Sequence, residues 1–151
     1  MTEQERNLGR RWFEEVWNKG RREAIAEMLP PEAVLHEAGV DSAGAEGFYP
    51  YYDRLRTALT EIHFDVDDSL ANEDTICVRW VFTSKHTGEG LGVAPSGKAI
   101  NVTGISVIRV ANGMLIEGWQ NWDMLGLMQQ IQGTSKAATY VGAPSAISAT
   151  S

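Results

Sequence analysis

A tryptophan-rich segment near the end of the sequence, residues 113–123, combines an acidic side chain with two indoles. Its apolar residues and turn signal predict a strand, on which successive side chains point to opposite faces. Trp119 and Asp123 would then share one face, and Gln120 and Trp122 the other. An aspartate enclosed beside an indole would have a raised pKa, which suits a general acid or base. The alternative is that Asp123 caps the helix predicted to follow.

Two histidines are further candidates for a site. His36 lies on a short predicted extended segment, 33–37, where it can hydrogen-bond a substrate oxygen or pair with a carboxylate. The alternative for His36 is burial with its nitrogens bonded to the backbone. His86 ends a predicted strand beside a glycine-rich loop, where a place at a cavity rim or a structural role is expected. The three histidines are too scattered in the sequence to predict a metal site.

Aromatic side chains supply the candidate walls of an apolar pocket. In the predicted strand 75–86, Trp80, Phe82 and His86 fall on one face. The cluster 48–52 contains three tyrosines beside glycine-rich sequence and resembles a cavity entrance. At regular helical or strand spacing, aromatic residues more often belong to the core, which is the alternative for most of them. Trp17, Tyr51, Tyr52 and Trp119 complete the set of candidate pocket aromatics.

Composition and charge limit the class of protein. The 151 residues are 43% hydrophobic, which fits one globular domain with a sizeable core. A formal net charge of −7 argues against nucleic acid or an anionic membrane as the main partner. The first residues lack the apolar segment of a signal peptide, and no stretch is long enough to span a membrane, so a cytoplasmic location is expected. The single cysteine, Cys77, is expected to pack as a small hydrophobe.

Helices are expected first in the chain. Apolar residues spaced by four predict a helix from about Glu3 to Asn18, and a short second helix is expected before Pro30. A third helical face extends to Leu59, with Pro50 placed in its first turn and a loop before it.

Strands follow, because the apolar period changes to two from residue 62. Four strands joined by turns such as Asn112-Gly113 predict an antiparallel meander, interrupted by a glycine-rich loop at 87–97. A final helix is expected from Met124 to about Gln132. The predicted domain is therefore residues 1–133, and the small, polar residues 134–151 predict a C-terminal tail.

Helices before a curved antiparallel sheet predict an α+β fold in which the helices cover one sheet face and enclose a cone-shaped cavity. Short motifs along the chain also carry a resemblance through their order and spacing. These motifs are EVWNKG at 15–20, RW at 79–80, LGVAPSG at 91–97, NG at 112–113 and IEGWQNWDMLGL at 116–127. Over about residues 10–132 the chain resembles the SnoaL-like polyketide cyclase family of the NTF2-like superfamily.

The resemblance implies an NTF2-like cone fold, no metal or organic cofactor, oligomers packed through the sheet, and acid/base chemistry on a bulky apolar ligand. The best-known reaction of the family is the intramolecular aldol ring closure of an aromatic polyketide ester. In many members an acid stands at the position that holds Gln120 here. Because an amide cannot exchange a proton usefully, Asp123 becomes the expected catalytic carboxylate, with His36 as its partner. Gln120 is then expected only to contact the substrate.

The expected function is a cofactor-independent enzyme that acts on an apolar, polyketide-type small molecule by aldol cyclisation or a related isomerisation. An epoxide hydrolase or dehydratase on the same fold is the second candidate. A non-catalytic small-molecule-binding module, which Gln120 favours, is the third. The strand near 98–110 has apolar residues on both faces, which predicts a homodimer or homotetramer packed through the sheet.

Overall fold

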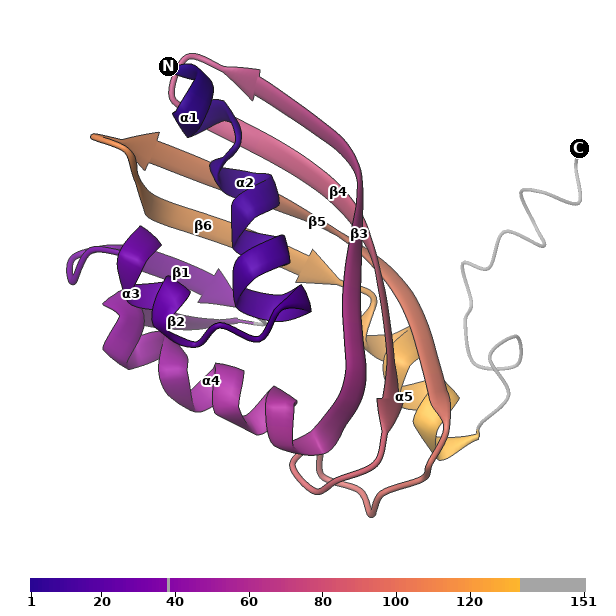
Figure 1. The fold of residues 1–151 in the computed structure, drawn as a ribbon. Coiled ribbons are helices and arrows are strands. Elements are labelled where there is room, and N and C mark those ends of the chain that lie inside the picture. The colour runs from indigo at the N-terminus through magenta and orange to yellow at the C-terminus, as the bar shows by residue number, and fades with distance from the viewer. Residues whose placement is uncertain (38, 134–151) are drawn as a thin grey trace, which may run out of the picture.

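The computed structural model describes residues 1–133 except residue 38, so the predicted tail at 134–151 lies outside the described residues. One curved sheet carries the helices on its concave side (Figure 1), and its strand order is β2-β1-β6-β5-β4-β3. The strands are β1 (Val34–Glu37), β2 (Val40–Ala43), β3 (Leu59–Asn72), β4 (Thr75–His86), β5 (Ala99–Ala111) and β6 (Met114–Trp122). The predicted α+β fold is confirmed.

The helices are α1 (Glu3–Arg6), α2 (Leu8–Arg11), the π-helix η1 (Trp12–Asn18), α3 (Glu23–Met28), α4 (Gly44–Ala58) and α5 (Met124–Gln132). The single helix predicted at the N-terminus is thus divided into three. In η1 the backbone bonds span five residues, and the N–H of Lys19 donates to the carbonyl of Glu14 at 2.8 Å. The wider turn buries Trp12, Phe13 and Trp17 together.

The predicted meander is confirmed, because β3, β4, β5 and β6 pair antiparallel in chain order. Asn112 and Gly113 form the turn between β5 and β6 with φ of 53° and 76°. At its other edge β6 pairs in parallel with β1, which sets Glu37 opposite Gln120. A residue of the N-terminal third therefore lies next to the C-terminal strand.

The region between residues 39 and 59 differs from the prediction. The expected loop contains β2, an antiparallel partner of β1. Helix α4 begins at Gly44, so Pro50 lies inside the helix and not in its first turn. Pro50 is exposed, so its ring projects into solvent at the cost of one backbone hydrogen bond. Leu59, expected on the helix, is the first residue of β3.

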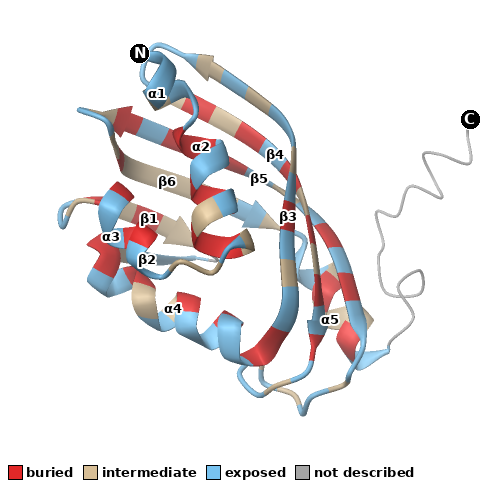
Figure 2. Ribbon diagram, viewed as in Figure 1, coloured by how far each residue is buried: buried red, intermediate tan, exposed pale blue. Residues whose placement is uncertain are grey.

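The core fills the space between the helices and the concave face, where the strands alternate between buried and exposed residues (Figure 2). On β4, Trp80 is fully buried, and its ring centroid lies 5.9 Å from that of Phe13 on η1. The indole of Trp80 covers Gly104 on β5, where a Cβ atom would overlap the ring. This glycine is therefore what allows a large indole to lie against the sheet. None of the helices in the described residues is long and apolar enough to cross a membrane.

Candidate functional site

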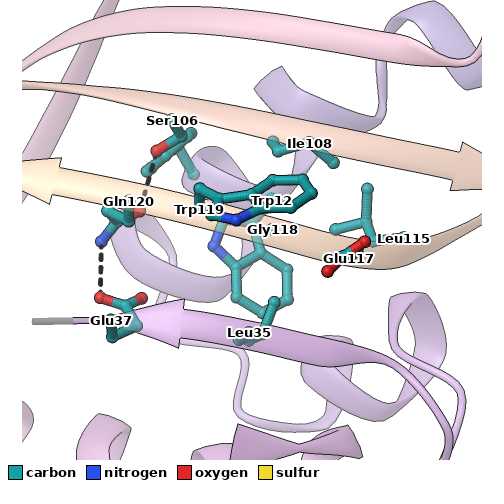
Figure 3. Close-up of a pocket in the computed structure, with 11 residues that line it drawn as sticks. Trp12, Leu35, Glu37, Ser106, Ile108, Leu115, Glu117, Gly118, Trp119 and Gln120 are labelled. Carbon is teal, nitrogen blue, oxygen red and sulfur yellow. Dashed lines mark hydrogen bonds between the residues drawn. The ribbon is translucent and has the colours of Figure 1, made fainter. Parts of the chain in front are cut away.

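A narrow cavity lies between the N-terminal helices and strands β1, β5 and β6 (Figure 3). Its volume is about 30 Å³, which is room for about one water molecule. The wall is mostly apolar and is formed by Trp12, Phe13, Leu35, Ile108, Leu115, Gly118 and Trp119, with Glu37, Ser106, Glu117 and Gln120 as its polar members.

A row of hydrogen bonds leads from the core to the acid of this cavity, and Figure 3 shows its last two bonds. The Nε1–H of Trp80 donates to Ser106 Oγ at 3.0 Å, and this hydroxyl donates to Gln120 Oε1 at 2.9 Å. Gln120 Nε2 in turn donates to Glu37 Oε2 at 3.3 Å. The sheet register produces the row, because Ser106 is opposite Gln120, and Gln120 is opposite Glu37.

Glu37 is an acid tuned to neutral pH. Burial of its carboxyl raises the pKa from 4.5 to about 7, although hydrogen bonds from Tyr51, Trp122 and Gln120 oppose the increase. The residue as a whole is only partly buried, but its carboxyl points into the apolar cavity. Near pH 7 this group is therefore present both as an acid and as a base, as general acid/base catalysis requires.

Two neutral hydrogen-bond donors lie beside this carboxyl. Burial raises the pKa of the Tyr51 hydroxyl well above its usual value, and the charge of Glu37 raises it further, so Tyr51 keeps its proton. The Nε1–H of Trp122 is buried and has no well-formed hydrogen bond within the described part of the chain, yet it is near enough to Glu37 to lower the pKa of the carboxyl. An oxygen atom placed next to Glu37 would therefore find donors on both residues.

Asp123 lies outside this cavity. It is exposed and caps α5, accepting a hydrogen bond from the N–H of Gly126 at 2.9 Å. Asp123 directly follows the last residue of β6 and lines an open groove together with Trp119 and Ile105. The contacts of Asp123 are thus those of a helix cap.

His36 also points away from the cavity, because neighbouring residues on β1 face opposite sides. Its ring stacks on Trp119 with centroids 5.1 Å apart. Nε2 lies 2.9 Å from Glu117 and Nδ1 lies 2.7 Å from Asp41, and these two hydrogen bonds raise the pKa of the imidazole, with the larger effect from Glu117. The carboxylates that His36 contacts are therefore not that of Asp123.

The other candidate residues divide between the cavity and the core. Gln120 and Trp119 line the cavity, and Tyr51 reaches its acid. Trp17 and Tyr52 pack against each other with centroids 4.8 Å apart, and neither lines this cavity. Trp80 and Phe82 are likewise buried in the core, although Trp80 contacts the site through Ser106. His86 is fully buried and accepts a hydrogen bond from the backbone N–H of Ser96, so it anchors the loop between β4 and β5.

Sequence reasoning missed Glu37 and Ser106 as site residues. The alternation of side chains along β1 could have identified Glu37, because a strand that turns His36 outward must turn Glu37 inward. The same alternation along β5 could have identified Ser106, because it lies between Ile108 and Gly104 on the concave face. A lone serine among inward-facing apolar residues is a signal for a buried hydrogen bond.

Comparison with known proteins connects this geometry to a family. The model of the SnoaL-like polyketide cyclases matches residues 7–131. The chain belongs to this SnoaL-like polyketide cyclase family. The predicted family and the predicted NTF2-like fold are both confirmed. No curated protein matches the chain.

Solved structures with the SnoaL-like fold cover nearly all of the described chain. A candidate SnoaL-like polyketide cyclase from Jannaschia sp. CCS1 has a TM-score of 0.80 at 24% identity, over 87% of this chain and 94% of the other. A candidate polyketide cyclase from Acidithiobacillus ferrooxidans gives 0.77 at 26% identity, over 89% and 99%. TsrD from Streptomyces laurentii gives 0.76 at 23% identity, over 87% and 97%. This SnoaL-like chain therefore shares its architecture with proteins from three different organisms.

Proposed function

We propose that this SnoaL-like protein is an enzyme that moves a proton at a carbon next to a carbonyl group in an uncharged, apolar small molecule. The observation that supports it is the cavity carboxyl of Glu37, with a pKa of about 7, beside the donors Tyr51 and Trp122. This arrangement fits a carbon acid, which needs one base and a stabilised oxyanion. The proposed location is the cytoplasm, and no cofactor is part of the proposal.

In the proposed reaction, ionised Glu37 removes a proton from the carbon next to the carbonyl. The electron pair of the broken C–H bond moves to the carbonyl oxygen, where the O–H of Tyr51 and the N–H of Trp122 stabilise the enolate. In an aldol ring closure, the enolate carbon then bonds to a second carbonyl carbon of the same molecule. The proton held by Glu37 passes to the new alkoxide, which restores the carboxylate. An isomerisation returns that proton to a different carbon.

The wall of the cavity limits the substrate. Its ionisable residues are Glu37 and Glu117, and no lysine or arginine is among the described residues that line it. Glu117 is already bonded to His36 and lies 3.7 Å from Arg109, so the described wall offers no free cation to a substrate carboxylate or phosphate, and an ester or ketone is the better fit. Sites for drug-sized ligands usually measure about 300 to 1,000 Å³. A polycyclic substrate therefore requires wall residues such as Trp12 to move.

The proposal is tested with 2-tetralone, an uncharged bicyclic ketone, and with the smaller cyclohexanone. Exchange of their α-hydrogens for deuterium is followed by proton NMR in deuterated buffer. With the protein present we expect faster exchange than in buffer, with a rate that rises through an apparent pKa near 7 and then levels off, because the ionised form of Glu37 is the base. Exchange no faster than in buffer for both ketones, or a rate without that inflection, would count against the proposal.

The other candidate functions draw on the same site. Room for about one water molecule beside Glu37 favours epoxide opening as the second candidate, because that reaction needs a carboxylate to activate water. Formation of a diol from styrene oxide would identify it. The third candidate, a non-catalytic binding module, rests on the amide at Gln120, which cannot exchange a proton. Glu37 weakens this candidate, because it places a carboxylate within hydrogen-bond distance of that amide.

We also propose that the protein is a homodimer packed through the outer face of the sheet. Ile105 is 48% exposed there and lines a groove with Val107 and Trp119. Burying such a patch favours association. Light scattering is expected to give twice the chain mass of 16.6 kDa. The variant Ile105→Lys should give the monomer mass, and a wild-type monomer at micromolar concentration would contradict the proposal.

A further inference from the structure

We infer that Ser106, itself held by Trp80, is a positioning residue that fixes which end of the Gln120 amide faces Glu37. The inference rests on the proposed function, because it concerns the group proposed as acid and base. Ser106 is 3% exposed and Trp80 is fully buried. Bulk water therefore does not compete for the bond between Trp80 and Ser106, and Ser106 presents a fixed donor to Gln120 Oε1.

The direction of the row follows from what each group can donate. An indole N–H donates and cannot accept, so Trp80 occupies one lone pair of Ser106 Oγ. The hydroxyl of Ser106 keeps one proton, and Gln120 Oε1, 2.9 Å away, accepts it. The amide has its oxygen at one end and its NH2 group at the other. Once the oxygen faces Ser106, the NH2 group must face Glu37.

The orientation of the amide affects the protonation of Glu37. An NH2 group that donates to the carboxyl favours its ionised form. With the amide reversed, its oxygen would repel a carboxylate but accept a hydrogen bond from a protonated carboxyl, which favours the acid form. Ser106 therefore selects the orientation that helps Glu37 to act as a base. Gln120 thereby becomes a neutral link between the core and the proposed catalytic carboxyl.

The test is a carbon-13 NMR titration of the side-chain carboxyl of Glu37 in the substrate-free protein. The signal is identified by its loss in Glu37→Gln. Ser106→Ala is expected to raise the pKa of Glu37 by about one unit, because the amide is then free to reverse. Ser106→Thr, which keeps the hydroxyl, should restore the wild-type value. If Ser106→Ala does not fold, Ser106→Cys serves the same purpose, because a thiol of similar size is a much weaker hydrogen-bond donor than the hydroxyl.

A double-mutant comparison separates positioning from a general structural effect. Gln120→Leu should also raise the pKa of Glu37, and Ser106→Ala should add no further shift in that background, because Ser106 acts through the amide. Shifts that add, or an unchanged pKa in Ser106→Ala, would overturn the inference. The titration does not depend on turnover. A shifted pKa without exchange of 2-tetralone would sink the proposed function and leave the positioning role standing, whereas exchange with an unshifted pKa would do the reverse.

Discussion

Glu37→Gln is expected to lower the rate of 2-tetralone exchange by about 10²- to 10⁴-fold, the usual contribution of a general acid or base. The amide keeps the shape of the side chain but cannot carry a proton to and from carbon. The fold should not suffer. Because burial raises the pKa of Glu37 from 4.5 to about 7, the folded carboxyl lowers stability as the pH rises from about 4.5 to 7. The melting temperature of the variant relative to wild type should therefore be more favourable at pH 8 than at pH 4.

The matched control is Asp123→Asn, the same chemical change at the exposed cap of α5. Asparagine is as good an N-cap as aspartate, so stability should change little. The exchange rate should stay within about twofold of wild type, because a group outside the cavity is not expected to carry protons for the reaction. Loss of exchange in Asp123→Asn with exchange retained in Glu37→Gln would instead assign catalysis to Asp123.

Gly104→Ala is expected to lower the free energy of unfolding by about 3 kcal/mol, at the upper end of the usual cost of overpacking a core. The new Cβ would overlap the indole of Trp80 and lie 2.7 Å from the carbonyl oxygen of Asn121. Trp80 has nowhere to withdraw, because it is fully buried and its ring packs edge-on against Trp122 with centroids 5.2 Å apart. Urea denaturation of the variant and the wild type measures the loss.

Gly118→Ala is the control on the neighbouring strand. Its Cβ would lie 3.1 Å from Leu35 Cδ2, the flexible end of a side chain, so the cost should stay below about 1 kcal/mol. Similar losses in the two variants would mean that alanine in this sheet is unfavourable in general and that the overlap with Trp80 is not the cause.

Most of the sheet could be predicted from the sequence because its strands alternate clearly. On β3, Phe64 is buried while His63 and Asp65 are exposed, as their order predicts. Strand β2 carries no such pattern, since it is mostly exposed and exists through its pairing with β1. The pattern of apolar residues also does not reveal that η1 is a π-helix. Its apolar residues follow the spacing of an ordinary amphipathic helix, and the π-helical bonds only widen the buried side.

The candidate site was harder to predict for a similar reason. Both faces of β6 carry an indole, Trp119 on one and Trp122 on the other, and the residues of the strand do not say which face meets the helices. Which face of β6 meets the helices depends on its pairing with β1 and β5. Glu37 joins Gln120 across 83 positions of sequence, through a parallel pairing that no local motif encodes. Strand parity can set Glu37 on the face opposite His36, but the sequence alone does not place it beside Gln120.

Strand β3, which forms one of the two edges of the sheet, affects how this protein behaves when it is crowded. It is 14 residues long, and its edge is only partly free, because the side chain of Asn18 bonds both the N–H and the carbonyl of Phe64 there. A fully free edge of that length could template the addition of further chains into a fibril. Two interruptions of its register with β4 bend it, and the exposed carboxylate of Asp65 repels an identical edge. The strand is thus protected against runaway growth, and a concentrated solution of the protein is expected to stay free of amyloid-like aggregates.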